Sequence, residues 1–326
     1  MRKKLPFMIL QDILLTGLVL CVFALFHHVL PRMNPGPNPA ASTPVVLTPA
    51  PEKAGPSRAG PQYETPWQET FAGRFTPETV VTENSYSSPE ISVTIDTVST
   101  QINGEPLVYY VADIYISRIE NFQTYVENEY FNQFIKTPAD ELAQMCDAVV
   151  SINGDYCNAQ DQFGFFVRNG VLYDDRQTES DICVLFRDGT MATYGPKEYT
   201  VEDVLARQPY QVWKFGPMLL DANGQPLEDF NVRGAIGGRN PRSAIGYYEP
   251  GHYCFVVVDG RQADWSRGLD IRQLAQLFAD LGCRAAYNLD GGASATMTFD
   301  GQLINRQSKY REIGDILLIK EVGSQP

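Results

Sequence analysis

Several loops of the sequence combine carboxylates, arginines and glycines in a way that suits a site for an anionic ligand. The most informative loop runs Asn-Leu-Asp-Gly-Gly-Ala-Ser from Asn288 to Ser294. It follows a predicted buried strand, at the carboxyl end where ligand sites gather in α/β sheets. Asp290 supplies a carboxylate and Ser294 a hydroxyl. Gly291 and Gly292 let a ligand approach the backbone, and their N–H groups could bind an anion. A tight Asp-Gly hairpin turn is the alternative interpretation.

A second loop, residues 151–156, places Asn153 and Asp155 directly after an apolar strand. An amide and a carboxylate at a strand end suit binding or general acid–base chemistry. Asn-Gly is also the strongest two-residue hairpin signal, so an ordinary turn is again the alternative.

Two arginines stand beside turns further along the chain. Arg242 lies in the run Asn-Pro-Arg-Ser, and Arg261 closes the run Val-Asp-Gly-Arg that contains Asp259. A planar guanidinium can hold a phosphate through two parallel hydrogen bonds. Surface ion pairs are the competing explanation in so acidic a chain.

Strands and helices alternate around these loops and must position them. The clearest helix covers residues 269–281, where apolar residues recur at three- and four-residue steps. A second helix is predicted over 138–146. Predicted strands cover 91–98, 108–116, 147–152, 182–186, 211–215, 244–248, 253–258, 284–289 and 313–319. The stretch 253–289 reads as a βαβ unit. We therefore expect one catalytic α/β domain of mixed α+β content, residues 88–322, on a mixed β-sheet with flanking helices.

The N-terminal part predicts an anchor and a tether. A basic flank of Arg2, Lys3 and Lys4 precedes the uncharged apolar stretch Ile13–Leu30. Residues 1–30 therefore predict a single-pass transmembrane signal-anchor with its N-terminus in the cytoplasm and the domain outside the cell. A cleaved signal peptide, and hence a secreted protein, is the alternative. Residues 31–87 predict a linker and lead-in, since 31–66 hold 10 of the 22 prolines.

Charge and histidine content exclude several functions. The net charge is −13, and beyond residue 60 the chain has 20 basic against 37 acidic groups. Sequence-independent nucleic-acid binding is therefore excluded. Only His252 lies beyond the apolar stretch, which excludes a multi-histidine zinc site. Five cysteines lie beyond that stretch, an odd number, and most sit in apolar runs. We expect most of them to be buried free thiols.

The ordered set of loops resembles the phosphodiester glycosidase family. The resemblance rests on five runs over about residues 90–322: Ile152–Tyr156, Phe215–Leu219, Asn240–Gly246, Val258–Arg261 and Asn288–Gly292. One departure is Cys157, where the family usually has an aromatic residue. The resemblance implies removal of a sugar from a sugar-1-phosphodiester, on a cell-surface glycan or exopolysaccharide. The identity of the sugar does not follow from it.

The chemistry of such a bond suits the residues in these loops. A departing phosphate monoester has a second pKa of about 6, so it needs far less protonation than an alkoxide. Arginines and N–H groups can hold its charge, and a carboxylate can activate water or stabilise the sugar cation. We expect Asp290 to be the reacting carboxylate, with Asp155 either as its partner or as the alternative to it. The expected substrate-binding residues are Arg242 and Arg261 with Gly291, Gly292 and Ser294 for phosphate, Asn153 and Asn288 for sugar hydroxyls, and Asp259 to orient Arg261.

Three alternatives stay open. The chain could be a glycosidase for a neutral glycan, with structural arginines. It could be a non-catalytic module that binds cell-wall glycans. No cofactor is required by the proposed chemistry, but Asp155, Asp259 and Asp290 could together collect a hard cation such as Ca²⁺.

Overall fold

The computed structural model describes residues 45–47, 66–127, 135–155, 164–232 and 234–323. The strands in these residues form three sheets, and every pairing between them is antiparallel. The helices are few and short, so the fold is a sheet-rich α+β domain.

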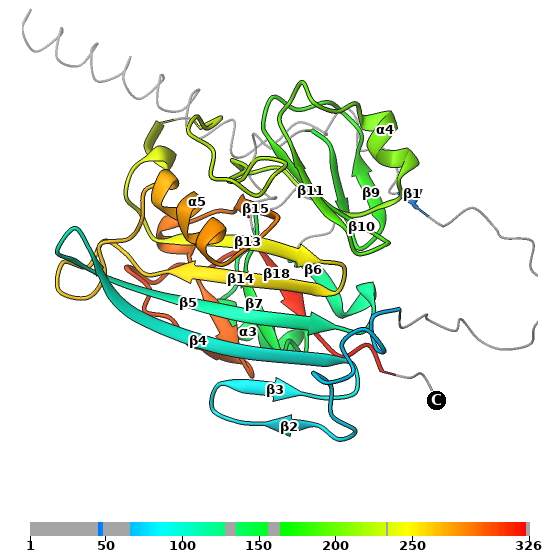
Figure 1. The fold of residues 1–326 in the computed structure, drawn as a ribbon, viewed down its shortest axis with the longest axis horizontal. Coiled ribbons are helices and arrows are strands. Elements are labelled where there is room, and N and C mark those ends of the chain that lie inside the picture. Colours follow the sequence, from blue (N-terminus) through cyan, green and yellow to red (C-terminus); the bar gives the residue numbers. More distant parts are fainter. Residues whose placement is uncertain (1–44, 48–65, 128–134, 156–163, 233, 324–326) are drawn as a thin grey trace, which may run out of the picture. The chain divides into compact units, whose positions relative to one another are not determined.

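A seven-stranded sheet forms the centre of the described fold (Figure 1). In spatial order it contains β15 (Ala285–Asn288), β13 (Arg242–Glu249), β14 (His252–Val258), β5 (Glu105–Ile116), β4 (Ile91–Ile102), β3 (Ser85–Ser87) and β2 (Val80–Val81). Strand β14 is almost continuously apolar because both of its faces are covered, which is why Tyr253 to Val258 are all buried.

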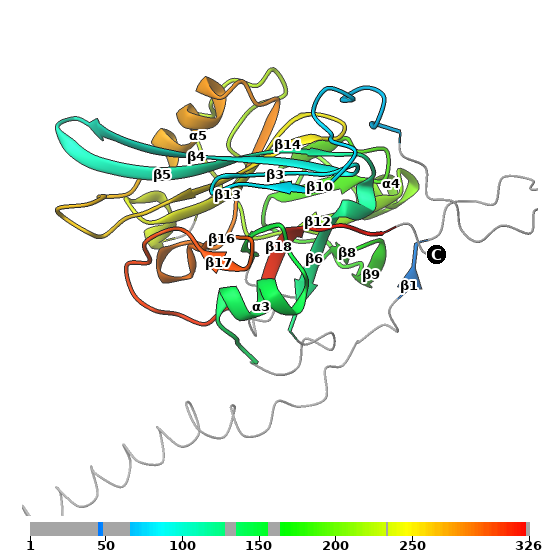
Figure 2. The same ribbon diagram turned by 90° about the horizontal axis from the view of Figure 1, so that it is seen from below.

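A five-stranded sheet packs against one face of the central sheet, and helix α3 (Ala139–Met145) lies beyond it (Figure 2). Its order is β17 (Gln302–Leu303), β16 (Met297–Phe299), β7 (Val150–Asn153), β18 (Asp315–Ile319) and β6 (Phe122–Val126). Phe122 of β6 meets Phe255 of β14 edge to face, with ring centroids 5.5 Å apart. The main hydrophobic core lies between these two sheets and extends to a third sheet, to which Cys183 and Trp213 belong.

Helix α5 (Ile271–Asp280) covers the opposite face of the central sheet (Figure 2). Asp270 caps its first turn by accepting a 2.9 Å hydrogen bond from the Gln273 N–H group, and the Gln273 side chain returns the contact. The apolar stripe of the helix, including Leu274 and Phe278, is fully buried against β13, β14 and β15.

The third sheet packs beside the first two and carries helix α4 (Val201–Ala206) on its outer face. Its order is β1 (Val45–Val46), β9 (Val171–Asp174), β8 (Phe166–Arg168), β12 (Pro209–Trp213), β10 (Ile182–Phe186) and β11 (Met191–Tyr194). Three short 3₁₀ helices, η2 (Ile119–Asn121), η3 (Gly234–Gly237) and η4 (Gly292–Ser294), lie in the connections.

The predicted mixed sheet is wrong, although the predicted elements are present. Helix α5 does connect β14 to β15, and these strands run in the same direction. Strand β13 lies between them and pairs antiparallel with both, so the expected parallel pair does not form. The α+β part of the fold prediction holds. Its α/β part fails because β13, the first strand of the β13–β14 hairpin, lies between β14 and β15.

Parts of the N-terminal prediction fall outside the described residues. The expected anchor, residues 1–30, is among them. In the ranges that are described, none of the helices combines the length and the apolar character needed to cross a membrane. Within the expected linker and lead-in, the described residues add β1, β2 and β3 to sheets, and Trp67 is buried in the main core.

The cysteines in the described residues are free thiols. Cys183, Cys254 and Cys283 are buried, and Cys146 is partly exposed. The expectation of mostly buried free thiols is therefore confirmed for these four residues, while Cys157 lies outside the described residues.

Candidate active site

The candidate loops, far apart in sequence, meet at one edge of the sheets, where β7, β14 and β15 end and β13 begins. The Asp290 N–H group donates a 3.2 Å hydrogen bond to the Gly154 carbonyl oxygen, and Asn153 Nδ2 donates one of 2.6 Å to the Asp290 carbonyl oxygen. The Gly292 N–H group donates to the Pro241 carbonyl oxygen at 2.9 Å. The loops after β7 and β15 and the loop before β13 therefore form one cluster.

Asp290, a partly buried residue, lies in this cluster. Its Oδ1 atom accepts a 2.9 Å hydrogen bond from the Gly291 N–H group, and Ser294 also hydrogen-bonds the carboxyl group. Burial raises the pKa of Asp290, while these hydrogen bonds and the positive charges of Arg311 and Lys136 act in the opposite direction. Asp290 is thus a carboxylate with basic neighbours and partial access to solvent.

Arg261 lies next to the glycine pair. Its backbone has φ of +59°, and its guanidinium is exposed, with Nε and Nη2 donating to Asn240 Oδ1 at 3.2 and 2.6 Å. Gly292 also has positive φ, +66°, and a Cβ atom there would lie only 3.1 Å from Arg261 Nη2. Glycine is needed at 292 for both reasons, and its absent side chain leaves room for the guanidinium.

The two glycine N–H groups do not form the anion nest expected from the sequence. One donates to Asp290 Oδ1 and the other to the Pro241 carbonyl oxygen. Both donors are thus directed at acceptors within the protein, so an anion here would meet exposed cations such as Arg261 rather than these N–H groups.

Arg242, which the sequence predicted to bind phosphate together with Arg261, lies beneath this surface. It is 3 % exposed, and its Nε atom donates to the Leu269 carbonyl oxygen at 3.0 Å. Its Nη2 atom donates to the Gly238 carbonyl oxygen. Burial lowers the pKa of Arg242 to about 10, so it is still charged at neutral pH. Arg242 therefore ties two loops together through their main chains.

Asp155 is fully buried and forms an ion pair with Arg168 of β8, with 2.6 Å between Arg168 Nη2 and Asp155 Oδ1. Its other oxygen accepts a 3.0 Å hydrogen bond from the Lys214 N–H group. The Asp155 N–H group in turn donates to Asp315 Oδ2 at 3.0 Å. Asp155 thus connects the site to the third sheet and is not exposed beside Asp290.

Asp259 does not orient Arg261, contrary to expectation. Its buried carboxylate accepts hydrogen bonds from Trp265 Nε1 at 2.7 Å and Asn305 Nδ2 at 3.0 Å, and also from the Arg306 N–H group. Burial raises the pKa of the Asp259 carboxyl group, although these hydrogen bonds act in the opposite direction. Asp259 instead holds together the loop that carries Arg261.

The two asparagines differ in how fully they are hydrogen-bonded. Asn153 Oδ1 accepts from Ser243 Oγ at 2.5 Å and from the Thr296 N–H group at 3.2 Å. Asn288 Nδ2 donates to the Gly216 carbonyl oxygen at 2.8 Å. In the described part of the chain, the buried Asn288 Oδ1 atom has no hydrogen-bond partner. Asn153 therefore fixes the loops, and Asn288 retains an unused acceptor.

Sequence reasoning missed several charged residues of the site. Arg168 and Asp315 are buried partners of the 153–155 loop, and Arg311 and Lys136 supply positive charge near Asp290. A weak signal exists for two of them, because Arg168 and Asp315 each stand at the end of an apolar strand run. Nothing in the sequence around Arg311 or Lys136 distinguishes them from other surface cations.

His252 lies at the other end of β14 from the site loops, about 20 Å away at roughly 3.3 Å per residue. Its ring is stacked between Tyr115 and Tyr248, at centroid distances of 4.0 and 4.2 Å, and Nε2 lies 2.7 Å from Asp113 Oδ1. It therefore has no contact with the candidate site.

The three aspartates considered for a cation do not gather in one place. Among the described residues, no group of three or more His, Cys, Asp and Glu side chains is placed to hold a metal ion. Asp155 and Asp259 are each directed at donors of their own.

The fold and the site together define a sheet-rich α+β domain with a carboxylate-centred site whose exposed rim carries arginines. Such a rim suits an anionic substrate, and it stands out in a chain of net charge −13.

Residues 147–320 match the family model described as phosphodiester glycosidase, which is more than half of the chain. The chain therefore belongs to the phosphodiester glycosidase family, as the five runs of the sequence predicted.

Two curated relatives are similar to the chain. The SPbeta prophage-derived uncharacterized protein YomE of Bacillus subtilis (strain 168) is 29 % identical over 199 residues, 59 % of this chain and 31 % of YomE. Human N-acetylglucosamine-1-phosphodiester alpha-N-acetylglucosaminidase is 24 % identical over 225 residues, 59 % of this chain and 41 % of the human protein. The chain thus spans less than half the length of either relative.

Solved structures share the fold. The zebrafish N-acetylglucosamine-1-phosphodiester alpha-N-acetylglucosaminidase catalytic domain, auto-inhibited by its pro-peptide, has a TM-score of 0.59 at 20 % identity. The match covers 75 % of this chain and 88 % of that domain. A hypothetical protein from Synechocystis has a TM-score of 0.50 at 15 % identity, covering 75 % of this chain and 64 % of that protein.

Proposed function

We propose that the chain is a hydrolase that breaks the bond between the anomeric carbon of a sugar and the phosphate of a phosphodiester. One observation supports this most: Asp290 lies beside Gly292, over which Arg261 is held, and Arg311 and Lys136 place further positive charge near its carboxylate. A carboxylate next to exposed cations is what a sugar phosphodiester needs, since one end of the scissile bond becomes a sugar cation and the other a phosphate.

Asp290 is assigned to the sugar side of the bond. Its carboxylate would activate water or stabilise the oxocarbenium-like centre, and Ser294 and the Gly291 N–H group hold it in place. Arg261 is assigned to the phosphate side, where its charge-assisted hydrogen bonds strengthen as negative charge develops. No strong general acid is required, because a departing phosphate monoester has a second pKa of about 6.

The remaining candidates are assigned to positioning. Asn153 and Arg242 fix the loops that carry Asp290 and Arg261. The buried Asp155–Arg168 ion pair fixes the loop after β7, on which Asn153 lies. Asn288 keeps an unused acceptor beside these loops, which suits a hydroxyl donor from sugar or an ordered water.

The test compares a methyl phosphodiester of N-acetylglucosamine-1-phosphate with the methyl glycoside of the same sugar. The name of the human relative contains the N-acetylglucosamine-1-phosphodiester linkage, which is why this sugar is tested first. The corresponding compounds of glucose and galactose are tested as well. We expect release of free sugar from at least one phosphodiester, no release from its neutral glycoside, and loss of about 100- to 10,000-fold in Asp290→Asn. Asp96→Asn, on the exposed face of β4, is the matched control and should keep full activity.

Two results would contradict the proposal. Turnover of the neutral glycosides would indicate an ordinary glycosidase. Tight binding of a glycan without turnover of any substrate in the panel would indicate a binding module.

We also propose that the domain acts outside the cell, on a cell-surface glycan or exopolysaccharide. The basic flank, the apolar stretch Ile13–Leu30 and the proline-rich segment support this location. Protease added to intact cells should then remove the domain, whereas complete protection would place it inside.

A further inference from the structure

We propose that Cys254 and Cys283 form a disulfide bond when the chain meets a thiol oxidant, such as a small-molecule disulfide, outside the cell. The two sulfur atoms lie 3.8 Å apart in the structure, where both residues are free thiols. Among the described cysteines, this is the one pair whose sulfur atoms are in contact. The inference concerns the covalent structure of the domain and does not depend on the proposed hydrolysis.

The two cysteines belong to different parts of the fold. Cys254 lies within β14, in register with Gly246 of β13. Cys283 comes shortly after α5: Gly282 has φ of +79°, and the Cys283 N–H group donates to the Phe278 carbonyl oxygen at 3.1 Å. A bond between the sulfur atoms would therefore fasten the end of the helix to the central sheet.

Gly246 leaves the space in which the two sulfur atoms meet. A Cβ atom at this position would lie 2.6 Å from Cys254 Sγ and 2.7 Å from Cys283 Sγ, closer than real Cβ contacts. The backbone of Gly246 does not have positive φ, and glycine weakens the interior of a strand. Packing therefore explains the glycine, and its missing side chain lets the sulfur atoms approach each other.

A short movement separates the thiol pair from a disulfide. The S–S bond is about 2.05 Å long, so the sulfur atoms must approach by about 1.8 Å from their present distance of 3.8 Å. Rotation of the two side chains about their Cα–Cβ bonds moves each sulfur atom without moving the backbone. The sheet and the helix can therefore keep their places while the bond forms.

The reaction balances as a thiol–disulfide exchange. The thiolate of one cysteine attacks a sulfur atom of the oxidant, releases its first thiol and forms a mixed disulfide. The other cysteine then attacks the protein sulfur atom of this mixed disulfide and releases the second thiol. Two protein thiols are oxidised, the oxidant is reduced to two thiols, and the two protons pass to these products.

Burial determines when this exchange takes place. Cys254 is 0 % and Cys283 3 % exposed, in the apolar cluster beneath α5. Burial raises the pKa of the Cys254 thiol well above its ordinary value, which disfavours the reactive thiolate in the folded chain. We therefore expect the bond to form while the chain folds and to resist reductants afterwards.

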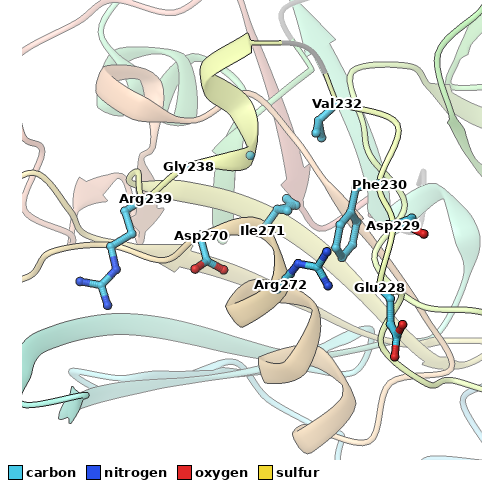
Figure 3. Close-up of a pocket in the computed structure, with 10 residues that line it drawn as sticks. Glu228, Asp229, Phe230, Val232, Gly238, Arg239, Asp270, Ile271 and Arg272 are labelled. Atoms are coloured by element: carbon cyan, nitrogen blue, oxygen red, sulfur yellow. The ribbon is translucent and has the colours of Figure 1, made fainter.

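The bond would complete the attachment of α5, because the start of the helix is already fixed. Figure 3 shows that end, where Asp270 borders a cavity. The capping box of Asp270 and Gln273 and the hydrogen bond from Arg242 to the Leu269 carbonyl oxygen hold it. Cys283 follows the opposite end, so the disulfide would fix both ends of the helix to the rest of the domain.

The experiment refolds the full chain from urea with either reduced or oxidised glutathione. Free thiols are then alkylated under denaturing conditions, and the digested chain is mapped by mass spectrometry. We expect the peptides that contain Cys254 and Cys283 to be joined after oxidising refolding and alkylated after reducing refolding. The oxidised chain should have a Tm about 5–10 °C higher, because the bond restricts the unfolded state.

Single substitutions assign this difference in Tm. Cys254→Ala and Cys283→Ala should each abolish the difference between the two refolding conditions. Cys183→Ala is the matched control, since Cys183 is equally buried and belongs to another part of the core, and this variant should keep the difference. Comparing two conditions within one variant cancels any loss of packing. If a variant does not fold, the peptide map of the parent chain decides.

Three results would overturn the proposal. The first is alkylation of both cysteines after oxidising refolding, and the second is a bond from either one to a different cysteine. The third is reduction of the bond by dithiothreitol at equal rates in the native and the urea-unfolded chain, because a buried disulfide should react far more slowly in the native chain. None of these measurements uses a sugar substrate, so they leave the test of hydrolysis separate.

Discussion

Asn153 Nδ2 donates a 2.6 Å hydrogen bond to the main-chain carbonyl oxygen of Asp290, 137 residues further along the chain. This bond joins the end of β7 to the end of β15, two strands in different sheets. It restricts the backbone that carries the proposed reacting carboxylate. The buried Asn153 amide therefore acts on the position of Asp290 rather than on the substrate.

Replacing Asn153 with alanine should weaken both the fold and the activity. The change leaves Ser243 Oγ, the Thr296 N–H group and the Asp290 carbonyl oxygen without this partner. Loss of these buried bonds should lower the free energy of unfolding by about 1–3 kcal/mol. Urea unfolding measures this loss, and kcat/KM should fall under conditions where the variant is fully folded. The exposed Asn223→Ala variant should change stability by less than about 0.5 kcal/mol.

Asp290 should make stability depend on pH in a defined direction. Burial raises its pKa above the ordinary 3.8, so the folded state binds the proton more tightly than the unfolded state does. Ionisation therefore costs stability as pH rises from 3.8 through the raised pKa. Asp290→Asn should gain thermal stability relative to the parent chain across that window and show no further gain above it. A difference in Tm that is constant from pH 3 to pH 8 would contradict this.

Activity should rise over the same pH window, because the proposed chemistry needs the ionised form of Asp290. The acid limb of the profile of kcat/KM against pH should therefore lie above the ordinary pKa of an aspartate. An acid limb with its midpoint at or below pH 3.8 would mean that the ionisation of another group controls the activity.

Substitutions of Arg261 and of Arg242 should affect activity in different ways. Arg261→Ala should lower kcat/KM on the phosphodiester by about 30- to 1,000-fold, because it removes a donor to the developing phosphate charge. An aryl glycoside of the same sugar, which carries no phosphate, should be affected little. Arg261→Lys should recover only part of the loss, since an ammonium group lacks the planar fork. Arg284→Ala, an exposed arginine after α5, is the control.

Arg242→Ala should behave as a structural variant. It removes the guanidinium donor to the Gly238 and Leu269 carbonyl oxygens, which keep only their hydrogen bonds from Asn240. Stability should therefore fall, and both substrates should lose activity together. A selective loss on the phosphodiester, in a variant with unchanged Tm, would return Arg242 to the role of a direct phosphate ligand.

His252→Ala should leave kcat/KM within about tenfold, since general acid–base groups contribute about 100-fold or more. The variant loses the stacking on Tyr115 and Tyr248, so thermal stability should fall while the pH profile of the activity keeps its shape. A thousandfold loss of activity with unchanged stability would place a histidine in the mechanism.

The sequence predicts elements well where local pattern decides them. Strand β10 and the helix over 269–281 occur within one or two residues of expectation, because apolar periodicity is a local signal. The order of strands is a different matter. Nothing in the residues of β13 indicates that it would lie between β14 and β15, since sheet order depends on long-range pairing.

The site was predictable in its loops and less so in the roles of its side chains. Residue type identified Arg242, Asp155 and Asp259 as chemically capable, but burial decides what each one contacts. All three face partners inside the protein. Asp290 is only partly buried and Arg261 is exposed, although Asp290 follows its strand by two residues just as the buried Asp155 does.

Strand β1 gives the proline-rich segment a second attachment to the domain. Val45 and Val46 pair with β9, the Leu47 N–H group donates to the Gly170 carbonyl oxygen at 2.8 Å, and Arg187 holds the Leu47 carbonyl oxygen. Residues 48–65 therefore connect two points that are both fixed to the same domain. A single proteolytic nick in that stretch would not by itself shed the domain, because the severed pieces stay joined through β1 until its few hydrogen bonds break.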